Sequence, residues 1–483
     1  MSNITETKED VNDRNSGSES TWGPGNEQHE PRKAINAMNW SLGMKIYHTA
    51  IPCFLAFLIT FSAAVTAPAT SALMAEFNIG RTKALLSGTL YMLGLAFGPL
   101  IMAPLSEFVG RRWLYLVTSS SIVAFAGGSG AARNLATLLT CRFFCGFLGS
   151  AGIAIGAGTI LDVWGLAETG SLAKLLFIFG PFLGPTLGPL AGAYVMHEHH
   201  GDWRWTQSMV ALIGAPIWVL ILFMRETSDV RIEHSAAQHS GRFGMVKLGL
   251  TTLKAAVLRS MTILTTEAIA FSLTLYTGYA YAVVFSFFAS ATYVYSIDYD
   301  FTSREIGLSF LGVVIGYCLA AVMHVVVQGT IYARAVRKAP DGRPAPEHRL
   351  YTAMAGSIFL PIGLFWYAWG AHQGGHWATV VASGIPFGLG AFVTFLSSIT
   401  YLIESYGTGA AASAIAANGS FRYLLGAVFP LFTIQMYEKL GIHWAGSVFA
   451  FLSLALLPIP WLLFKFGHRL RKKSRFIESS STN

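Results

Sequence analysis

Charged residues are scarce in this sequence. They make up 12% of the 483 residues, whereas an ordinary soluble domain carries about 25%. We therefore expect most of the chain to lie in lipid. The formal net charge is +8, but the basic residues fall in short clusters between apolar segments. That pattern argues against a nucleic-acid-binding face and favours a membrane protein with its basic loops on one side.

Cysteine is also rare, which excludes a disulfide framework as the source of stability. The four cysteines all lie in apolar segments, where a thiol behaves as a small hydrophobic group: Cys53, Cys141, Cys145 and Cys318. One stretch, residues 197–202, is rich in histidine and carboxylates. Its spacing fits no standard zinc site, and it falls in a short loop. We expect no metal centre.

An apolar targeting segment is missing from the beginning of the sequence. Residues 1–45 are polar and contain no apolar core of the kind found in a signal peptide, and they do not have the character of a transit peptide. We expect them to form a disordered cytoplasmic tail.

Long apolar runs are what the sequence does contain. A transmembrane helix needs about 20 mostly apolar residues, and twelve runs meet this need. They lie at 46–66, 84–104, 113–131, 135–160, 174–196, 206–224, 262–288, 305–330, 350–371, 376–402, 408–434 and 445–466. The sequence thus predicts an all-α integral membrane protein of twelve transmembrane helices.

The runs divide the chain into two six-helix halves, a plan common among secondary transporters. The halves are 46–224 and 262–466, separated by a polar central loop at 225–261 and followed by a basic cytoplasmic tail at 467–483. With the amino terminus inside, the inner segments carry 25 Lys and Arg when Lys174 and Lys465 at the inner ends of their spans are included, and the outer loops carry 6. This asymmetry predicts that both termini are cytoplasmic.

The loop between spans two and three reads Ser-Glu-Phe-Val-Gly-Arg-Arg from residue 106. Gly110 forms the turn, and Glu107 is close enough to Arg111 and Arg112 to form an ion pair or to brace a neighbouring helix end. Such a cluster can lock one conformation of an alternating-access transporter and release it in the other. The alternative is a solvated turn whose arginines only set the topology.

Arg142 lies inside span four among apolar residues. A charge at that depth is expensive in lipid, so we expect it to face the interior of the bundle and to have a partner. The alternative is snorkelling to the interface. The glycines of the same span, among them Gly149 and Gly158, are interpreted as ordinary packing positions.

Span five repeats glycine every four residues, at Gly180, Gly184, Gly188 and Gly192. The repeat makes a smooth face for close helix contact. Three prolines, of which Pro185 is central, interrupt the same helix and remove backbone donors. We therefore expect a bent or mobile helix involved in conformational change.

These motifs resemble those of the major facilitator superfamily. The loop motif has Glu107 where Asp is commoner, Ala103 where the motif opens with Gly, and Phe108 where Arg is frequent. Arg142 with Gly146 is similar to the fourth-helix motif of the superfamily. The Gly/Pro run of span five resembles the antiporter motif, which is largely restricted to exporters.

Further segments are similar to the fungal twelve-span drug:proton antiporters, a group of multidrug, polyamine and metabolite exporters. They include 264–267, 310–312, 360–366, Arg422 with 426–432, and 435–441. The resemblance runs from about residue 39 to residue 476. It implies export of small amphipathic molecules across the plasma membrane by a monomeric transporter that needs no cofactor besides a proton gradient.

By family position, six residues are candidates to line the substrate cavity: Tyr276, Tyr279, Phe285, Phe288, Asn418 and Arg422. The group often has a glutamate after two aromatics at the end of span seven, but this chain has Ala289 there. The missing carboxylate disfavours polyamines and favours a neutral or anionic cargo. A cavity-facing Arg422 would suit a carboxylate through bidentate contacts.

A proton antiporter needs a titratable group near the pathway. The candidates are Arg142, Asp162 and Glu267, with His324 and Glu404 as further possibilities; Arg142 could act with Asp162 or with Glu107. For Asp162 and Glu404, simple placement at the membrane interface is the favoured alternative. A transporter that moves cargo down its own gradient would need none of them.

The sequence thus predicts a secondary active exporter that is not an enzyme. An exporter dedicated to an organic acid or one pathway metabolite is the first alternative, because one fold serves many cargoes. An integral-membrane transferase is the alternative from another class, but it would require clustered Asp or His at one membrane face. The expected partners are a small-molecule substrate and membrane lipid, without nucleic acid.

Overall fold

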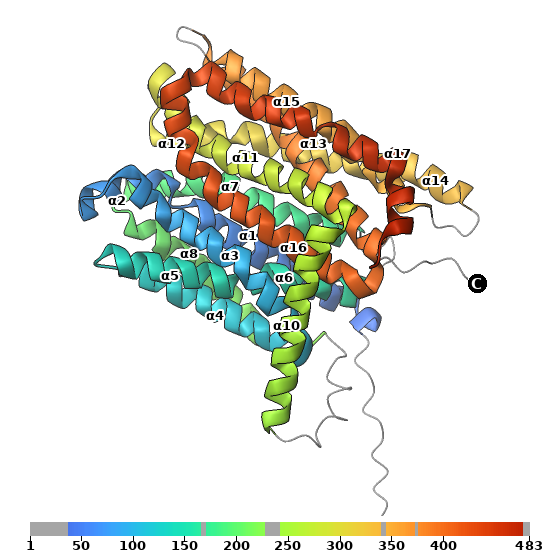
Figure 1. The fold of residues 1–483 in the computed structure, drawn as a ribbon. Coiled ribbons are helices and arrows are strands. Elements are labelled where there is room, and N and C mark those ends of the chain that lie inside the picture. The colour runs from blue at the N-terminus through green and yellow to red at the C-terminus, as the bar shows by residue number, and fades with distance from the viewer. Residues whose placement is uncertain (1–36, 166–170, 228–241, 340–343, 372–374, 477–483) are drawn as a thin grey trace, which may run out of the picture. The chain divides into compact units, whose positions relative to one another are not determined.

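A computed structural model describes residues 37–165, 171–227, 242–339, 344–371 and 375–476. Helices are the only regular elements in these ranges (Figure 1). Those of the first half are η1 (Ala37–Asn39), α1 (Leu42–Ala64), η2 (Ala67–Ala69), α2 (Thr70–Phe77), α3 (Arg81–Val109), α4 (Arg111–Gly130), α5 (Leu135–Gly149), α6 (Ala151–Trp164), α7 (Ser171–Glu198) and α8 (Arg204–Leu222).

The remaining helices begin after residue 241. They are α10 (Arg242–Thr266), α11 (Ala268–Asp298), α12 (Ser303–Ser309), α13 (Leu311–Val327), the π-helix η5 (Gln328–Tyr332), α14 (Ala333–Lys338), η6 (Pro346–Leu350), α15 (Tyr351–Gly370), α16 (Trp377–Leu456) and α17 (Pro458–Lys473). Residues 35–483 form one compact unit.

The helices account for the twelve predicted spans. Ten stretches of the described chain are long and apolar enough to cross a membrane. One of them, Ala410–Lys473, has 64 residues, enough for two spans, and Gly441 breaks it with a positive φ of 76°. Dividing it there and adding the 20-residue α4, which packs against α5 and α8, gives twelve.

Several predicted boundaries differ from the structure, each for a physical reason. The first span begins at Leu42 rather than 46, because the helix includes Lys45. The Lys45 ammonium lies 5.2 Å from the centre of the Trp164 ring, a contact that favours a cation there. The connections expected after spans ten and eleven shrink to single glycines, Gly407 and Gly441, within α16. Hydropathy cannot locate such breaks, since they depend on backbone dihedrals.

Part of the segment expected to be a central loop is helical. The predicted loop 225–261 contains the start of α10, which runs on to Thr266; span seven begins only at Ala268, after a break at Glu267. The basic tail expected from residue 467 is helical up to Lys473. Residues 1–36 and 477–483 lie outside the described ranges.

The two halves touch through a few elements. Helix α3 contacts α16 and α10, and α7 contacts α12, α13 and α16. The α3–α16 contact includes an ion pair between Arg81 and Glu438, with 3.1 Å between the charged atoms, and a hydrogen bond from Thr89 to the Ala427 carbonyl. We call the end of α3 where it begins, at this ion pair, the Arg81 end. The opposite end, where α3 meets α4, is the Gly110 end.

Candidate functional site

The Gly110 end carries a cluster of charges around the predicted loop motif. Gly110 joins α3 to α4 with φ 92°, a conformation that favours glycine. It has no side chain to cap α4, and Glu226 takes over this role. The Glu226 carboxylate accepts hydrogen bonds from the backbone nitrogens of Arg111 at 2.9 Å and Arg112 at 3.1 Å. A carboxylate is favourable there because the start of a helix carries partial positive charge.

Arg111 makes the second link in this cluster. Its Nε lies 2.5 Å from Asp162 on α6, and its Nη1 donates to the Ile155 carbonyl at 3.2 Å. Gly158 makes room for the guanidinium, since a Cβ at that position would lie 2.0 Å from Nη1. The interpretation of Gly158 as a plain packing residue was therefore wrong. Arg111 thus braces the end of α6, and a role of this cluster in locking one conformation stays a prediction.

The cluster differs from the predicted one in its partners. The predicted acid, Glu107, has a side chain outside what the structure describes, so its pairing stays a prediction. Sequence analysis missed Glu226 altogether. A usable signal existed, because Glu226 is the first carboxylate after span six and the predicted topology puts it on the same side as the loop.

Arg142 is completely buried and fully hydrogen-bonded. Its Nη groups donate to the Ser62 hydroxyl and carbonyl, to Thr66 and to Gln207 at 2.8–3.2 Å, and its Nε donates to the Ser87 carbonyl at 3.3 Å. These bonds match the five N–H donors of a guanidinium. Snorkelling is thus wrong for this residue. Its described partners are neutral, and Asp162 pairs with Arg111 instead.

The glycine stripe of α7 lies against α1. An added Cβ would lie 3.0 Å from the Cys53 carbonyl oxygen at Gly180, 2.2 Å from the Thr60 hydroxyl at Gly184, and 3.0 Å from the Phe61 carbonyl oxygen at Gly188. The predicted close contact is therefore present. α7 runs as one helix through Pro181, Pro185 and Pro189; its role in conformational change stays a prediction.

The second buried arginine, Arg422, has a different environment. Only 5% of its surface is exposed, yet among the described residues its Nε has no hydrogen-bond partner. Its guanidinium carbon lies 4.4–4.9 Å from the centres of three aromatic rings, those of Phe395, Tyr423 and Tyr281. The hydroxyls of Tyr281 and Tyr423 are also buried without a described partner. We call Arg422, Tyr281, Tyr423 and Phe395 the Arg422 box.

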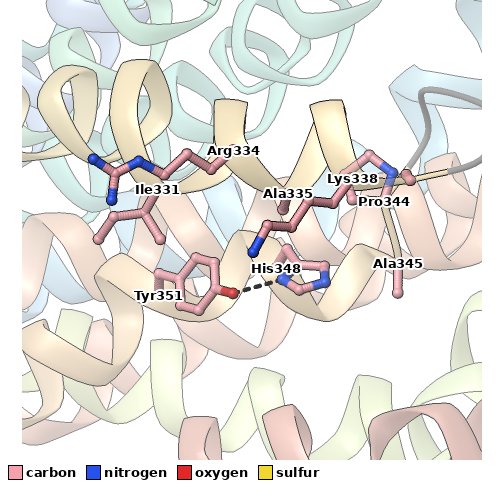
Figure 2. Close-up of a pocket in the computed structure, with 9 residues that line it drawn as sticks. Ile331, Arg334, Ala335, Lys338, Pro344, Ala345, His348 and Tyr351 are labelled. Carbon is pink, nitrogen blue, oxygen red and sulfur yellow. Dashed lines mark hydrogen bonds between the residues drawn. The ribbon is translucent and has the colours of Figure 1, made fainter.

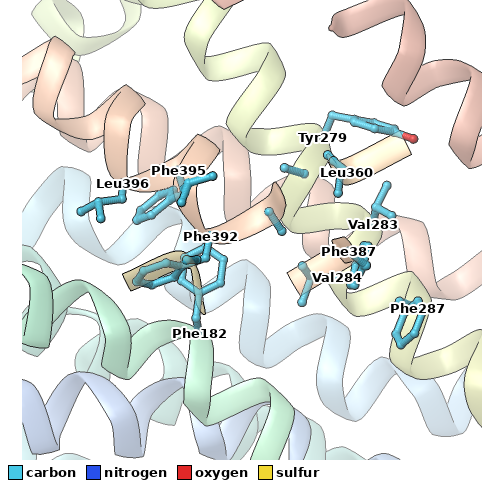
Figure 3. Packing of buried hydrophobic residues seen from close by; sticks show 14 of the residues in the cluster. Phe182, Tyr279, Val283, Val284, Phe287, Leu360, Phe387, Phe392, Phe395 and Leu396 are labelled. Atoms are coloured by element: carbon cyan, nitrogen blue, oxygen red, sulfur yellow. The ribbon is translucent and has the colours of Figure 1, made fainter. Parts of the chain in front are cut away.

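Phe182 of α7 packs against the Arg422 box from the other half of the molecule, and Figure 3 shows it beside Phe395, one residue of the box. Its ring centre lies 5.1 Å from that of Phe395 and 6.2 Å from that of Tyr281. Phe182 belongs to the Gly/Pro run, two residues before Gly184. The box therefore lies where the two halves meet, under a residue of the helix predicted to move.

Most of the other predicted cavity residues make separate contacts. The Tyr279 hydroxyl donates to the Phe449 carbonyl, Tyr276 contacts Thr394, and Phe288 packs against Phe310. Asn418 donates to Thr274 and Thr277. Only Phe285 reaches the box, with its ring centre 5.1 Å from that of Tyr281. Sequence analysis missed Tyr281, Tyr423, Phe395 and Phe182, because aromatics abound in all these helices.

The remaining titratable candidates lie in local networks. Glu267 is buried at the break between α10 and α11, where it accepts hydrogen bonds from Tyr406 and from the backbone of Arg475. Glu404 forms an ion pair with Arg349, and His324 lies 3.4 Å from Thr352. None of these contacts reaches the Arg422 box.

A pocket of about 550 Å³ opens between α14 and η6 (Figure 2). Arg334, Lys338 and His348 line it, with a hydrogen bond between His348 and Tyr351. All its lining residues belong to the second half, whereas Phe182 of the first half packs against Phe395 of the Arg422 box. We therefore place the candidate site at the Arg422 box.

Comparisons with known proteins agree with this architecture. The family model described as Major Facilitator Superfamily matches residues 53–430. "MFS-type transporter traF" of Penicillium crustosum is 36% identical and covers 92% of each chain. "Major facilitator superfamily multidrug transporter mdrA" of Aspergillus fumigatus is 36% identical over 94% of this chain and 75% of its own length. "Polyamine transporter 4" of Saccharomyces cerevisiae is 32% identical over 92% and 72%.

Solved structures show the same fold at low identity. The proton:xylose symporter XylE aligns with a TM-score of 0.64 at 13% identity, covering 88% of this chain and 96% of its own. The human organic anion transporter MFSD10 aligns with a TM-score of 0.59 at 17% identity, covering 86% and 99%. The chain is a multi-pass membrane protein that belongs to the major facilitator superfamily.

Proposed function

We propose that this protein exports small amphipathic molecules, such as drugs, toxins or secondary metabolites, across the plasma membrane. Several relatives support export, since they carry the names efflux pump and multidrug transporter. The observation that carries the proposal is the buried Arg422 box of the second half, against which Phe182 of the first half packs. A site at the contact between two halves can open to either side as they rock.

The excess of Lys and Arg in the predicted inner segments favours cytoplasmic termini. In this orientation the Gly110 end faces the cytoplasm and the Arg81–Glu438 pair faces outward. The outer ion pair and the inner Arg111–Asp162 pair would then break in opposite halves of the cycle. We propose that the transporter works as a monomer.

We further propose that inward proton movement drives export. Protonation of Asp162 would neutralise the carboxylate that binds Arg111 and so release the end of α6 from α4. Glu267 is the second candidate, because its carboxylate links the start of α11 to Tyr406 and Arg475. Arg142 would keep a fixed positive charge near the pathway.

The test is accumulation of labelled cargoes in cells that express or lack the protein, with and without a protonophore. The panel contains a neutral drug, a polyamine and an amphipathic carboxylate. We expect lower accumulation of the drug or the carboxylate and loss of this effect with the protonophore. Export that survives the protonophore would contradict proton antiport. If cells with and without the protein accumulate every cargo equally, the proposed export is contradicted.

Asp162→Asn separates the coupling step from export itself, because asparagine resembles the protonated acid. We expect export by this variant to become insensitive to the protonophore or to stop. Glu198→Gln, at the exposed end of α7, is the matched control and should behave as the parent protein. Unchanged protonophore-sensitive export by Asp162→Asn would remove Asp162 from the coupling mechanism.

A further inference from the structure

Two buried arginines in the same protein have opposite environments. All five N–H donors of Arg142 are used, and its acceptors come from α1, η2, α3 and α8 or their immediate ends. Arg422 has ring faces around it and an Nε without a partner in the described chain. The fold is thus able to supply acceptors to every donor of a deeply buried arginine, and at Arg422 it does not.

The position of Arg422 makes the missing partner significant. It lies on α16, 15 residues after the break at Gly407 and 19 before the break at Gly441. At 1.5 Å per residue, these are about 22 Å and about 28 Å from the two breaks. Arg422 therefore lies deep in the hydrocarbon region, where a charge ordinarily pairs with an opposite charge or lines a substrate pathway.

The side chains around Arg422 define the chemistry that would complete the site. No carboxylate of the described residues lies within ion-pairing distance of its guanidinium. The hydroxyls of Tyr281 and Tyr423 are further donors without a described acceptor. Phe182 and Phe395 add only apolar surface. Donors thus outnumber acceptors, and apolar faces surround them.

We propose that the Arg422 box binds the carboxylate of an anionic amphipathic cargo, whose apolar body packs against Phe182 and Phe395. A guanidinium fork matches a carboxylate bidentately, which a neutral hydroxyl or amide cannot reproduce. The tyrosine hydroxyls donate to the carboxylate oxygens that remain. This inference rests on the proposed export function and names its cargo class.

The geometry also links cargo binding to closure. Phe182 lies on α7, whose Gly184 packs against Thr60 and Phe61 of α1. A shift of α7 along α1 would carry Phe182 away from Phe395 and open the box to one side. A bound carboxylate would add an ion pair beneath Phe182 and so stabilise the occluded state.

The test uses three carboxylates, each paired with its neutral amide: 2-naphthoate, decanoate and indole-3-acetate. Binding to the purified full-length protein in nanodiscs is measured calorimetrically at pH 7. We expect at least one carboxylate to bind about tenfold or more tightly than its amide, as a charge-assisted bidentate pair implies. Arg422→Gln should remove that preference, whereas Lys439→Gln should retain it.

Tyr423→Phe provides a milder variant, since it keeps the ring and removes only the hydroxyl. We expect it to weaken carboxylate binding and leave amide binding unchanged. The inference is overturned if all three carboxylates bind no better than their amides, or if the preference survives Arg422→Gln. If the inference is overturned and the parent protein still exports a neutral drug, the proposed export stands. If the parent protein exports none of the cargoes, the inference and the proposed export are both rejected.

Discussion

The carboxylate of Glu226 lies across the start of α4, 2.9 Å from the backbone nitrogen of Arg111. These residues are 115 positions apart, so the contact ties the end of span six to the loop between spans two and three. One carboxylate thereby performs the capping that Gly110 lacks a side chain to perform. The loop is best understood as one part of a cluster with Glu226 and Asp162.

The first prediction concerns this cap. Glu226→Ala should lower the stability of the purified protein by about 0.5–2 kcal/mol, the usual effect of removing a helix cap. The exposed Glu198→Ala should have little effect. The measurement is the thermal unfolding midpoint in detergent, compared among the three proteins. Equal midpoints for the parent and Glu226→Ala would show that the cap is not needed.

The second prediction concerns Gly158. Gly158→Ala would place a methyl group 2.0 Å from the present position of Arg111 Nη1, so the guanidinium must move and its bonds to Asp162 must weaken. We expect export to fall while surface abundance is retained. Gly127→Ala on α4 is the control, because its added Cβ meets nothing within 4 Å. Full export by Gly158→Ala would contradict a role for the Arg111–Asp162 pair.

The third prediction concerns the approach of α7 to α1. At Gly184 an added Cβ would lie 2.5 Å from the backbone nitrogen of Phe61, which cannot move aside as a flexible side chain does. Gly184→Leu should therefore block the contact and arrest transport. Gly43→Leu, at an open position of α1, should not. Cargo efflux from preloaded cells measures both, and an active Gly184→Leu variant would reduce α7 to a scaffold.

The fourth prediction compares the two buried arginines. Arg142→Gln removes most of a satisfied hydrogen-bond network and should destabilise the protein by several kcal/mol. Arg422→Gln removes an unpaired charge, so stability without cargo should be unchanged or higher. Thermal unfolding of both variants tests the difference. A large loss of stability in Arg422→Gln would indicate a structural role for that side chain.

The fifth prediction concerns the contact between the halves at the Arg81 end. Across this contact, the Nε2 atom of Gln435 donates a hydrogen bond to the Thr82 hydroxyl over 3.5 Å. In a background with Cys318→Ser, Thr82→Cys with Gln435→Cys should cross-link on oxidation and stop transport, and a reductant should restore it. Each single cysteine variant is the control. Transport by the cross-linked protein would show that this contact need not open.

The sequence by itself determined the fold class, because each span needs about 20 consecutive apolar residues and such runs can be located in the sequence. It also located the residues that require explanation. An arginine within an apolar run must be buried with partners, whatever they are, and glycines four residues apart must face a neighbouring helix. Arg142 and the stripe at Gly180, Gly184 and Gly188 meet these requirements in the structure.

Only the tertiary structure decided which residues satisfy those needs. Asp162 and Glu226 reach Arg111 from distant parts of the chain, and Phe182 reaches the Arg422 box from the other half. The cost of burying a charge is a local property of the sequence, whereas the identity of its partner depends on how helices pack. Arg142 and Arg422 look alike in sequence, and packing alone gives one of them five acceptors and leaves the other facing aromatic rings.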